Sequence, residues 1–182
     1  MKQNGHRAEA LRFPARDTEI GKIIDNYLKS TQHLSDHAIH LLFSANRWEL
    51  NALIREKLES GITLVVDRYA FSGASYSHAK GLDLTWCKNP DKGLPRPDLV
   101  IFLDIDIEKS KKRGAFGSER YEKEEMQKQV RRIFLDMAKE EEESKYWKVL
   151  GADKSIDEIH EEILNYVLPV LNSVGSLPIL NL

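Results

Sequence analysis

The sequence contains a single cysteine, Cys87. One cysteine cannot form a disulfide within the chain, and zinc sites built on thiolates need several cysteines. Both are therefore excluded, and the sequence suits a reducing compartment. We interpret Cys87 as structural or incidental, since free cysteines are commonly buried.

Long apolar runs are also absent, the longest being strand-like stretches such as Leu99–Leu103. A membrane-spanning helix needs roughly 20 apolar residues, and residues 1–7 lack the apolar region of a signal peptide. The net charge of −2 gives no reason to expect a nucleic-acid partner. We expect a cytoplasmic protein with neither a membrane nor a nucleic acid as a partner, and leave a nuclear or mitochondrial pool open.

The sequence lacks a glycine-rich phosphate loop as well. The pattern Gly-x-x-x-x-Gly-Lys-[Ser/Thr], whose backbone amides hold nucleotide phosphates, does not occur in the 182 residues. Residues 1–5 instead have the pattern of a final helical turn with a glycine stop. We therefore expect the chain to begin inside the fold, after a strand and most of a helix.

What the sequence does contain is an alternation of strand-like and helix-like segments, without repeats or low-complexity linkers. This alternation is typical of an α/β domain with a mainly parallel sheet, and 182 residues suit one domain. Strands are expected over residues 7–13, 62–66, 99–103 and 146–150. Helices are expected over about 20–28, 35–60, part of 71–88, a segment after 106, 122–143 and 156–167.

Local signals give some of the boundaries. Gly61 should end the second helix. The three prolines within 89–98 favour an extended connection. Ser155 and Glu158 form a capping box that opens the last helix, and Pro169 should weaken or end that helix.

The strand over 62–66 ends in Asp67 and Arg68. The carboxyl end of a parallel strand is where open α/β sheets bind ligands. A carboxylate there can orient hydrated Mg²⁺, and a guanidinium offers a planar fork to phosphate oxygens. Arg16 follows the first strand and should reach the same edge, where it would either share a phosphate with Arg68 or cap the next helix.

Two other segments carry candidate functional residues. Phe43 and Arg47 lie one helical turn apart, so that a base could stack on Phe43 while Arg47 donates to its carbonyl edge. The alternative is a core phenylalanine and a surface salt bridge. Residues 112–122 contain two glycines together with Arg113 and Arg120, a pattern that suits a lid closing over phosphates but also a solvated basic face.

Three histidines, His33, His37 and His40, could share a helix face. No recognised metal-ligand motif surrounds them, and a metal site needs several convergent ligands. We interpret them as part of a solvated helix end.

Four segments in combination resemble the thymidylate kinases, which convert dTMP and ATP to dTDP and ADP. The segments are Arg12–Pro14, Phe43–Glu49, Asp67–Gly73 and Gly93–Asp98. The resemblance is to the eukaryotic branch and runs from Gly5 to about Ile163. It implies a nucleoside monophosphate kinase fold of the P-loop NTPase type, a parallel sheet flanked by helices, with the first, central strand and the P-loop absent. Residues 1–182 would form one domain, incomplete at its N-terminus.

The resemblance also implies roles for residues. Phe43 would stack on thymine, Arg47 would read its carbonyl, and Arg16 and Arg68 would hold the acceptor phosphate. Asp67 would orient Mg²⁺, through water, and the acceptor phosphate. The remaining roles fall into two groups: dTMP would also contact Phe13, Ser72, Gly73 and Tyr76, and ATP would contact the lid residues Arg113 and Arg120 and the turn Ala152, Asp153 and Lys154. The family also implies a homodimer formed through helices that flank the sheet.

The absent phosphate loop leaves alternatives open. We expect little turnover, and the chain could instead be a shortened, inactive dTMP-binding form. A deoxynucleoside kinase is a third reading, although paired Arg16 and Arg68 favour a substrate that already carries a phosphate. In the family the absent strand lies between the strands that end near Asp67 and Leu103. Its loss predicts either a gap or a collapse of those two strands, and a domain less stable than a full-length member.

Overall fold

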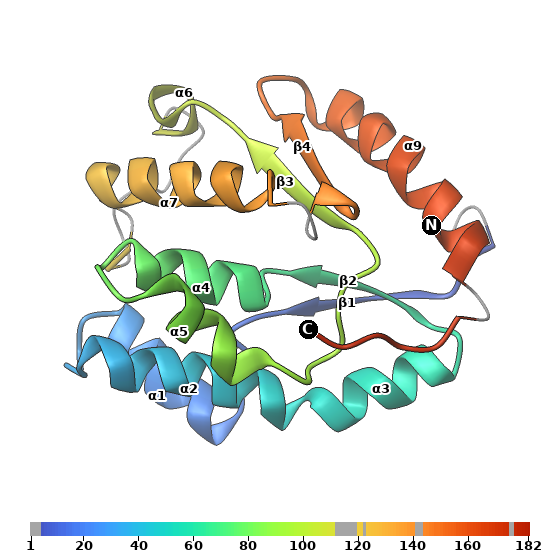
Figure 1. Cartoon of the computed structure of the whole chain (residues 1–182). Coiled ribbons are helices and arrows are strands. Elements are labelled where there is room, and N and C mark those ends of the chain that lie inside the picture. Colours follow the sequence, from blue (N-terminus) through green and yellow to red (C-terminus); the bar gives the residue numbers. More distant parts are fainter. Residues whose placement is uncertain (1–4, 112–119, 122, 141–143, 175–176) are drawn as a thin grey trace.

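A computed structural model describes residues 5–111, 120–121, 123–140, 144–174 and 177–182. Figure 1 shows strands and helices alternating along the chain. The strands are β1 (Ala8–Arg12), β2 (Thr63–Asp67), β3 (Val100–Asp104) and β4 (Trp147–Gly151). The helices are α1 (Glu19–Leu28), α2 (Asp36–Glu49), α3 (Asn51–Glu59), α4 (Ala70–His78), α5 (Leu84–Lys88), the 3₁₀ turn η2 (Asn89–Asp91), α6 (Ile107–Lys111), α7 (Glu124–Met137) and α9 (Ile156–Val174).

The four strands form two parallel pairs. β1 pairs with β2, and β3 pairs with β4. Within the described residues the two pairs are separate sheets, and Figure 1 shows them on different levels of the molecule. The α/β class and the parallel pairing predicted from the sequence are confirmed. The sequence left open a gap or a collapse of β2 onto β3, and the structure excludes the collapse, because β2 and β3 do not pair.

Two apolar clusters hold the helices on these strands. The first joins α1 and α2 through Ile24, Tyr27, Leu28 and Ile39. The second joins α4, α7 and β4 through Phe71, Met137 and Trp147. The second cluster spans both strand pairs, because α4 follows β2 directly while Trp147 belongs to β4. Apolar burial of this kind is the main favourable term in folding, so this cluster holds the two sheets together.

Several predicted boundaries hold. Gly61 has a φ of +71° and follows Ser60, the C-cap of α3, as a glycine stop requires. Glu158 accepts from the backbone of Ser155, and Ser155 accepts from the backbone of Glu158, so the capping box is confirmed. Gly5 has a φ of +80°, and residues 1–4 lie outside the described residues.

Two sequence predictions were wrong in detail, and one alternative of a third is excluded. The helix expected over 35–60 is interrupted at Leu50, whose backbone (φ −96°, ψ 1°) ends α2 and precedes α3. The connection expected to be extended begins with a 3₁₀ turn at Asn89–Asp91. Pro169 was expected to weaken or end its helix, and it does not end it, since α9 continues to Val174. A proline removes one backbone donor, and its neighbours can still maintain the helix.

Within the described residues no helix is long and apolar enough to cross a membrane.

Candidate active site

The carboxyl ends of β1 and β2 form one edge of the first sheet. Arg12 and Asp67 are paired across the strands, and the Arg12 Nε donates to Asp67 Oδ2 at 2.6 Å. The carboxylate is half-exposed. A carboxylate at this edge points toward the region where α/β sheets bind ligands, and its contact with Arg12 uses only Oδ2.

Arg68 turns the chain sharply away from β2. Its φ of +63° lies in the left-handed region, which is uncommon for residues other than glycine. Its guanidinium carbon lies 5.4 Å from the ring centroid of Tyr76 on α4. Strained backbone of this kind clusters at functional sites, so Arg68 is a candidate ligand-binding residue with a fixed direction.

The loop after β1 carries Arg16 and is fixed from α2. Asn46 is fully buried, and its amide accepts from the Ala15 backbone and donates to Thr18 Oγ. Arg16 itself contacts Asp25 of α1 at 2.6 Å. The pKa of Asp25 is lowered, mainly by its hydrogen bond from Lys29 and also by Arg16. In this structure Arg16 therefore contacts the next helix, which is the alternative that the sequence left open.

Arg47 forms a buried bidentate ion pair with Asp91. Arg47 Nε donates to Asp91 Oδ1 at 3.0 Å and Nη2 donates to Oδ2 at 2.7 Å. The two side chains are 2% and 3% exposed. The alternative reading of Arg47 as a surface salt bridge was wrong, because its partner lies in the interior. Asp91 is the residue that sequence reasoning missed, since it precedes the Gly93–Asp98 segment and no motif marked it.

Helix α4 supplies the other wall beside Arg47. A Cβ atom at Gly73 would lie 2.9 Å from Arg47 Nη2 and 3.0 Å from Nη1, so the guanidinium packs directly on the glycine. Ser72 and Tyr76 lie one turn apart on the same helix. Tyr76 also contacts Gln127 of α7, which donates to its hydroxyl at 3.2 Å. The structure therefore brings Gly73 and Arg47 together, and places Tyr76 beside Arg68.

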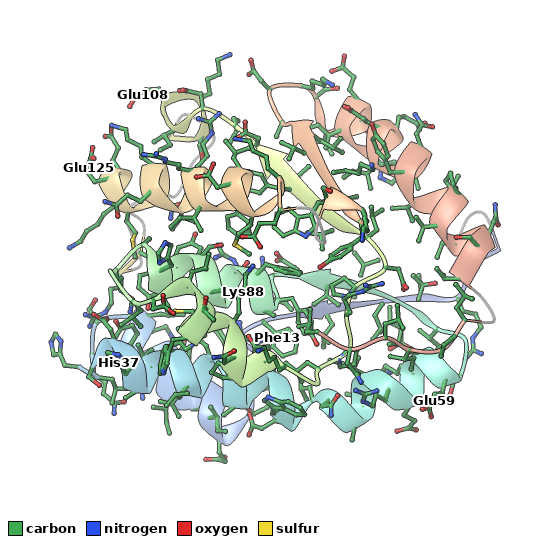
Figure 2. All side chains as sticks on the ribbon, viewed as in Figure 1. Phe13, His37, Glu59, Lys88, Glu108 and Glu125 are labelled. Carbon is green, nitrogen blue, oxygen red and sulfur yellow. The ribbon has the colours of Figure 1, made fainter. Side chains whose placement is uncertain are left out.

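The two aromatic candidates differ in exposure. Phe13, labelled in Figure 2, is 3% exposed. It packs on Tyr69, with ring centroids 5.7 Å apart. Phe43 is half-buried and packs against the cluster of α1 and α2. Only a partly exposed ring can offer a face to a ligand, so Phe43 is the better candidate for stacking.

Of the two arginines predicted to belong to a lid, the structure describes only Arg120. Arg113 lies outside the described residues. Arg120 donates from Nε to the Tyr27 carbonyl at 2.9 Å and from Nη2 to the Gln32 carbonyl at 3.2 Å. Its guanidinium carbon lies 4.2 Å from the Tyr27 ring centroid. Arg120 thus satisfies carbonyl groups at and beyond the C-terminal end of α1.

The turn Ala152–Lys154 follows β4, at the carboxyl end of the second sheet. The Ala152 backbone donates to the Asp104 carbonyl at 2.7 Å, and Ala152 is buried. Asp153 pairs with Lys109, and Lys154 pairs with Glu162 at 2.6 Å. These side chains lie at the carboxyl end of β4, whereas the Asp67 group lies at the carboxyl end of β2.

The prediction of a solvated helix end was wrong for His40, whereas His33 and His37 are exposed. His40 is fully buried between Ser77 Oγ, 2.7 Å from Nδ1, and the Cys87 carbonyl, 3.0 Å from Nε2. A carbonyl can only accept, so Nε2 carries the proton and Nδ1 accepts from Ser77. Burial is the main cause that lowers the pKa of His40. Burial also raises the pKa of Cys87 to about 11, so that thiol is unreactive.

Metal ligands are sparse in the described part of the chain. It has no group of three or more His, Cys, Asp or Glu side chains that could hold a metal ion. Asp67 is the one carboxylate proposed for a metal at this edge. That arrangement fits Mg²⁺, which often keeps several waters and takes one or two carboxylates together with substrate phosphates.

Comparison with known proteins assigns the arrangement to a family. The family model of thymidylate kinase matches residues 1–163. The chain belongs to the thymidylate kinase family. It is 54% identical to the human thymidylate kinase over 160 residues, which cover 87% of this chain and 74% of the human protein. It is 52% identical to the Schizosaccharomyces pombe thymidylate kinase over 162 residues, covering 88% and 77% of the two chains.

A solved structure of a thymidylate kinase extends the comparison to the fold. The Candida albicans enzyme matches with a TM-score of 0.88 and 34% identity, covering 96% of this chain and 86% of that one. The expected fold of the nucleoside monophosphate kinases is therefore confirmed. The chain is a thymidylate kinase by family, a transferase that acts on nucleotides.

Proposed function

We propose that this chain binds dTMP at the edge formed by Asp67 and Arg68 and uses ATP to phosphorylate it. In the reaction an oxygen of the dTMP phosphate bonds to the γ-phosphorus of ATP. The bond from that phosphorus to the β–γ bridging oxygen breaks, and ADP leaves. No covalent enzyme intermediate is required, because such enzymes work by positioning and charge stabilisation.

The phosphate end of dTMP is assigned to Arg68 and Arg16. Arg68 has a left-handed backbone that aims its side chain toward α4. Arg16 sits on a loop that Asn46 fixes from α2. Arginine suits this task because its planar fork matches phosphate oxygens. On binding, Arg16 would exchange its contact with Asp25 for the phosphate.

The base end is assigned to Phe43, Arg47 and Gly73. Phe43 is half-buried and can stack, while the Arg47 guanidinium packs against Gly73. The single observation that carries the proposal is this buried, prearranged guanidinium one helical turn from an accessible ring. Ser72, Tyr76 and Phe13 would complete the pocket, with Phe13 supporting it from the interior.

The ATP end is assigned to Arg120 and the turn Ala152–Lys154, with Arg113 added from the sequence. Each described cation here is already bonded: Arg120 to the carbonyls of Tyr27 and Gln32, and Lys154 to Glu162. The proposal therefore requires Arg120 to leave those carbonyls when a nucleotide is bound.

Mg²⁺ is the proposed metal, with Asp67 as its protein group. When bound with ATP, Mg²⁺ neutralises charge on the phosphates. Asp67 would hold it through water from Oδ1, since the contact with Arg12 uses Oδ2.

We also propose a homodimer and a cytoplasmic location. Leu41, Trp48 and Leu53 on α2 and α3 are 47%, 39% and 41% exposed, which leaves apolar surface on helices that flank the first sheet. A single buried cysteine needs no oxidising compartment. Besides a second copy of the chain, small nucleotides are the only partners proposed. Light scattering and cell fractionation test these two points.

The function is tested by a coupled assay for dTDP formation together with calorimetric titration of dTMP. Turnover that depends on ATP and Mg²⁺ supports the full proposal. Binding of dTMP without turnover supports only the acceptor site. A chain that neither binds dTMP nor forms dTDP overturns the proposal.

A further inference from the structure

We propose that Asp91 is a positioning residue for base recognition, which holds the Arg47 guanidinium in the orientation that a pyrimidine carbonyl requires. This inference rests on the proposed function, since it assumes that Arg47 addresses the base. Asp91 itself is not assigned to contact the nucleotide. It acts through Arg47.

The Asp91 carboxylate accepts three hydrogen bonds that hold it in place. Arg47 donates to both of its oxygens, and Ser44 Oγ donates to Oδ1 at 2.7 Å. Asp91 is 2% exposed. A buried carboxylate with three donors has one stable orientation, because any rotation leaves a charged oxygen without a partner.

The turn that carries Asp91 is also fixed. Ser44 Oγ and Trp48 Nε1 both lie within hydrogen-bonding distance of the Pro90 carbonyl, at 3.1 and 2.8 Å. Arg55 Nη2 donates to the Gly93 carbonyl at 2.9 Å. Side chains of α2 and α3 therefore hold the backbone on both sides of Asp91.

The guanidinium is confined from two directions. Asp91 accepts hydrogen bonds from Nε and Nη2. Gly73 packs against Nη1 and Nη2 so closely that a side chain at position 73 would have no room. Nη1 is the nitrogen that makes no bond to Asp91. A guanidinium held in this way loses no rotamer entropy when it binds a planar ligand. Asp91 therefore orients Arg47 before the base binds.

The test separates base recognition from phosphate binding. Calorimetry measures the affinity of each variant for dTMP and for 2-deoxyribose 5-phosphate, which has the same sugar and phosphate but no base. Asp91→Asn should weaken dTMP binding by roughly 10-fold to 100-fold, the range of a hydrogen bond to a charged group. It should leave 2-deoxyribose 5-phosphate binding unchanged within about twofold.

Ser44→Ala is the second variant, because it removes one donor to Asp91 and keeps the ion pair. It should weaken dTMP binding by roughly threefold, without affecting 2-deoxyribose 5-phosphate. Asp83→Ala is the matched control: it removes the side-chain cap of α5 and should lower thermal stability without changing the ratio of the two affinities.

The outcomes distinguish this inference from the proposed function. If the unaltered chain does not bind dTMP, the proposed function fails and the inference fails with it. If the unaltered chain binds dTMP but both variants lose the two ligands equally, only the positioning role is overturned. If Asp91→Asn does not fold, as judged by circular dichroism, Ser44→Ala decides: an unchanged affinity ratio then overturns the role of Asp91.

Discussion

Two ion pairs, one beside each sheet, differ in how far they are removed from water. Beside the first sheet, Arg47 and Asp91 are 2% and 3% exposed. Beside the second, Lys109 and Asp153 are 54% and 59% exposed. A buried charge must keep its partner, because losing it leaves an uncompensated charge in a medium of low dielectric, whereas an exposed pair is largely replaced by water. The base end of the proposed dTMP site is thus prearranged, and the turn proposed to contact ATP is adaptable.

The helices show the same difference. α2 buries Ile39, His40, Ser44, Asn46 and Arg47. α9, which is longer, has no buried residue. Polar groups in the first region are therefore held by tertiary contacts, while those of the second remain in contact with solvent.

The largest expected effect comes from Arg47→Ala, which leaves the Asp91 carboxylate buried without its counter-ion. The free energy of unfolding should fall by about 3–5 kcal/mol. Urea denaturation measures it. As a control, the double variant Arg47→Leu with Asp91→Leu should recover most of the loss, because apolar side chains fill the space without buried charge. A single variant that loses under about 1 kcal/mol would contradict the burial of this pair.

The next effect concerns pH and His40. The folded chain keeps His40 neutral, because burial and the nearby Arg47 lower its pKa, whereas the unfolded chain titrates near 6.5. As the pH falls through 6.5 toward the lowered value, the unfolded state binds a proton that the folded state does not, and stability falls. The hydrogen bond with the Cys87 carbonyl and the charge of Asp91 raise the pKa of His40, but they offset only part of the lowering.

Thermal unfolding from about pH 7.5 to about pH 5.5 checks this prediction. His40→Gln removes the titrating group and should show a smaller fall in melting temperature over that interval. Carboxylates elsewhere contribute equally to both proteins. Parallel pH dependences would show that His40 does not couple to folding.

A smaller effect is expected at Arg131, which forms a second bidentate pair with Asp104 at 2.5 and 2.8 Å. Its side chain is 41% exposed, so solvent screens the pair despite its geometry. Arg131→Met should lower the free energy of unfolding by less than about 1 kcal/mol. Since the geometry matches that of Arg47 and Asp91, a loss as large as theirs would mean that geometry, and not burial, sets the cost.

The smallest effect is expected at Lys109. Its bond to Asp153 raises the pKa of Lys109, yet both groups are exposed. Lys109→Gln should leave the unfolding midpoint unchanged at physiological salt, measured by thermal denaturation. A clear drop would show that the second region is as tightly coupled as the first.

Local sequence signals predicted the elements well where the cause is local. The apolar run before Asp67 predicted a strand that ends at a carboxylate, and Gly61 predicted the helix stop. The capping box at Ser155 and Glu158 depends on residues three apart, so it too could be read directly.

Signals that depend on distant partners could not be read. Helical periodicity continues through Leu50, and only tertiary packing reveals the break between α2 and α3. The partner of Arg47 lies 44 residues away in the chain, so spacing could not say whether Arg47 was exposed. Arg120 was recognised as a cation, but its contacts with the end of α1 come from an element 93 residues away.

By itself the sequence determined the α/β class, the strand that delivers Asp67 and Arg68, and the resemblance to the thymidylate kinases. These follow from hydrophobic periodicity, turn residues and short motifs, which act over a few residues. Only the tertiary structure decided that β2 and β3 lie in separate sheets and that Arg47 is buried against Asp91 and Gly73. Burial and pairing depend on which distant segments meet, and the free energy of a charge depends on how much water those segments exclude.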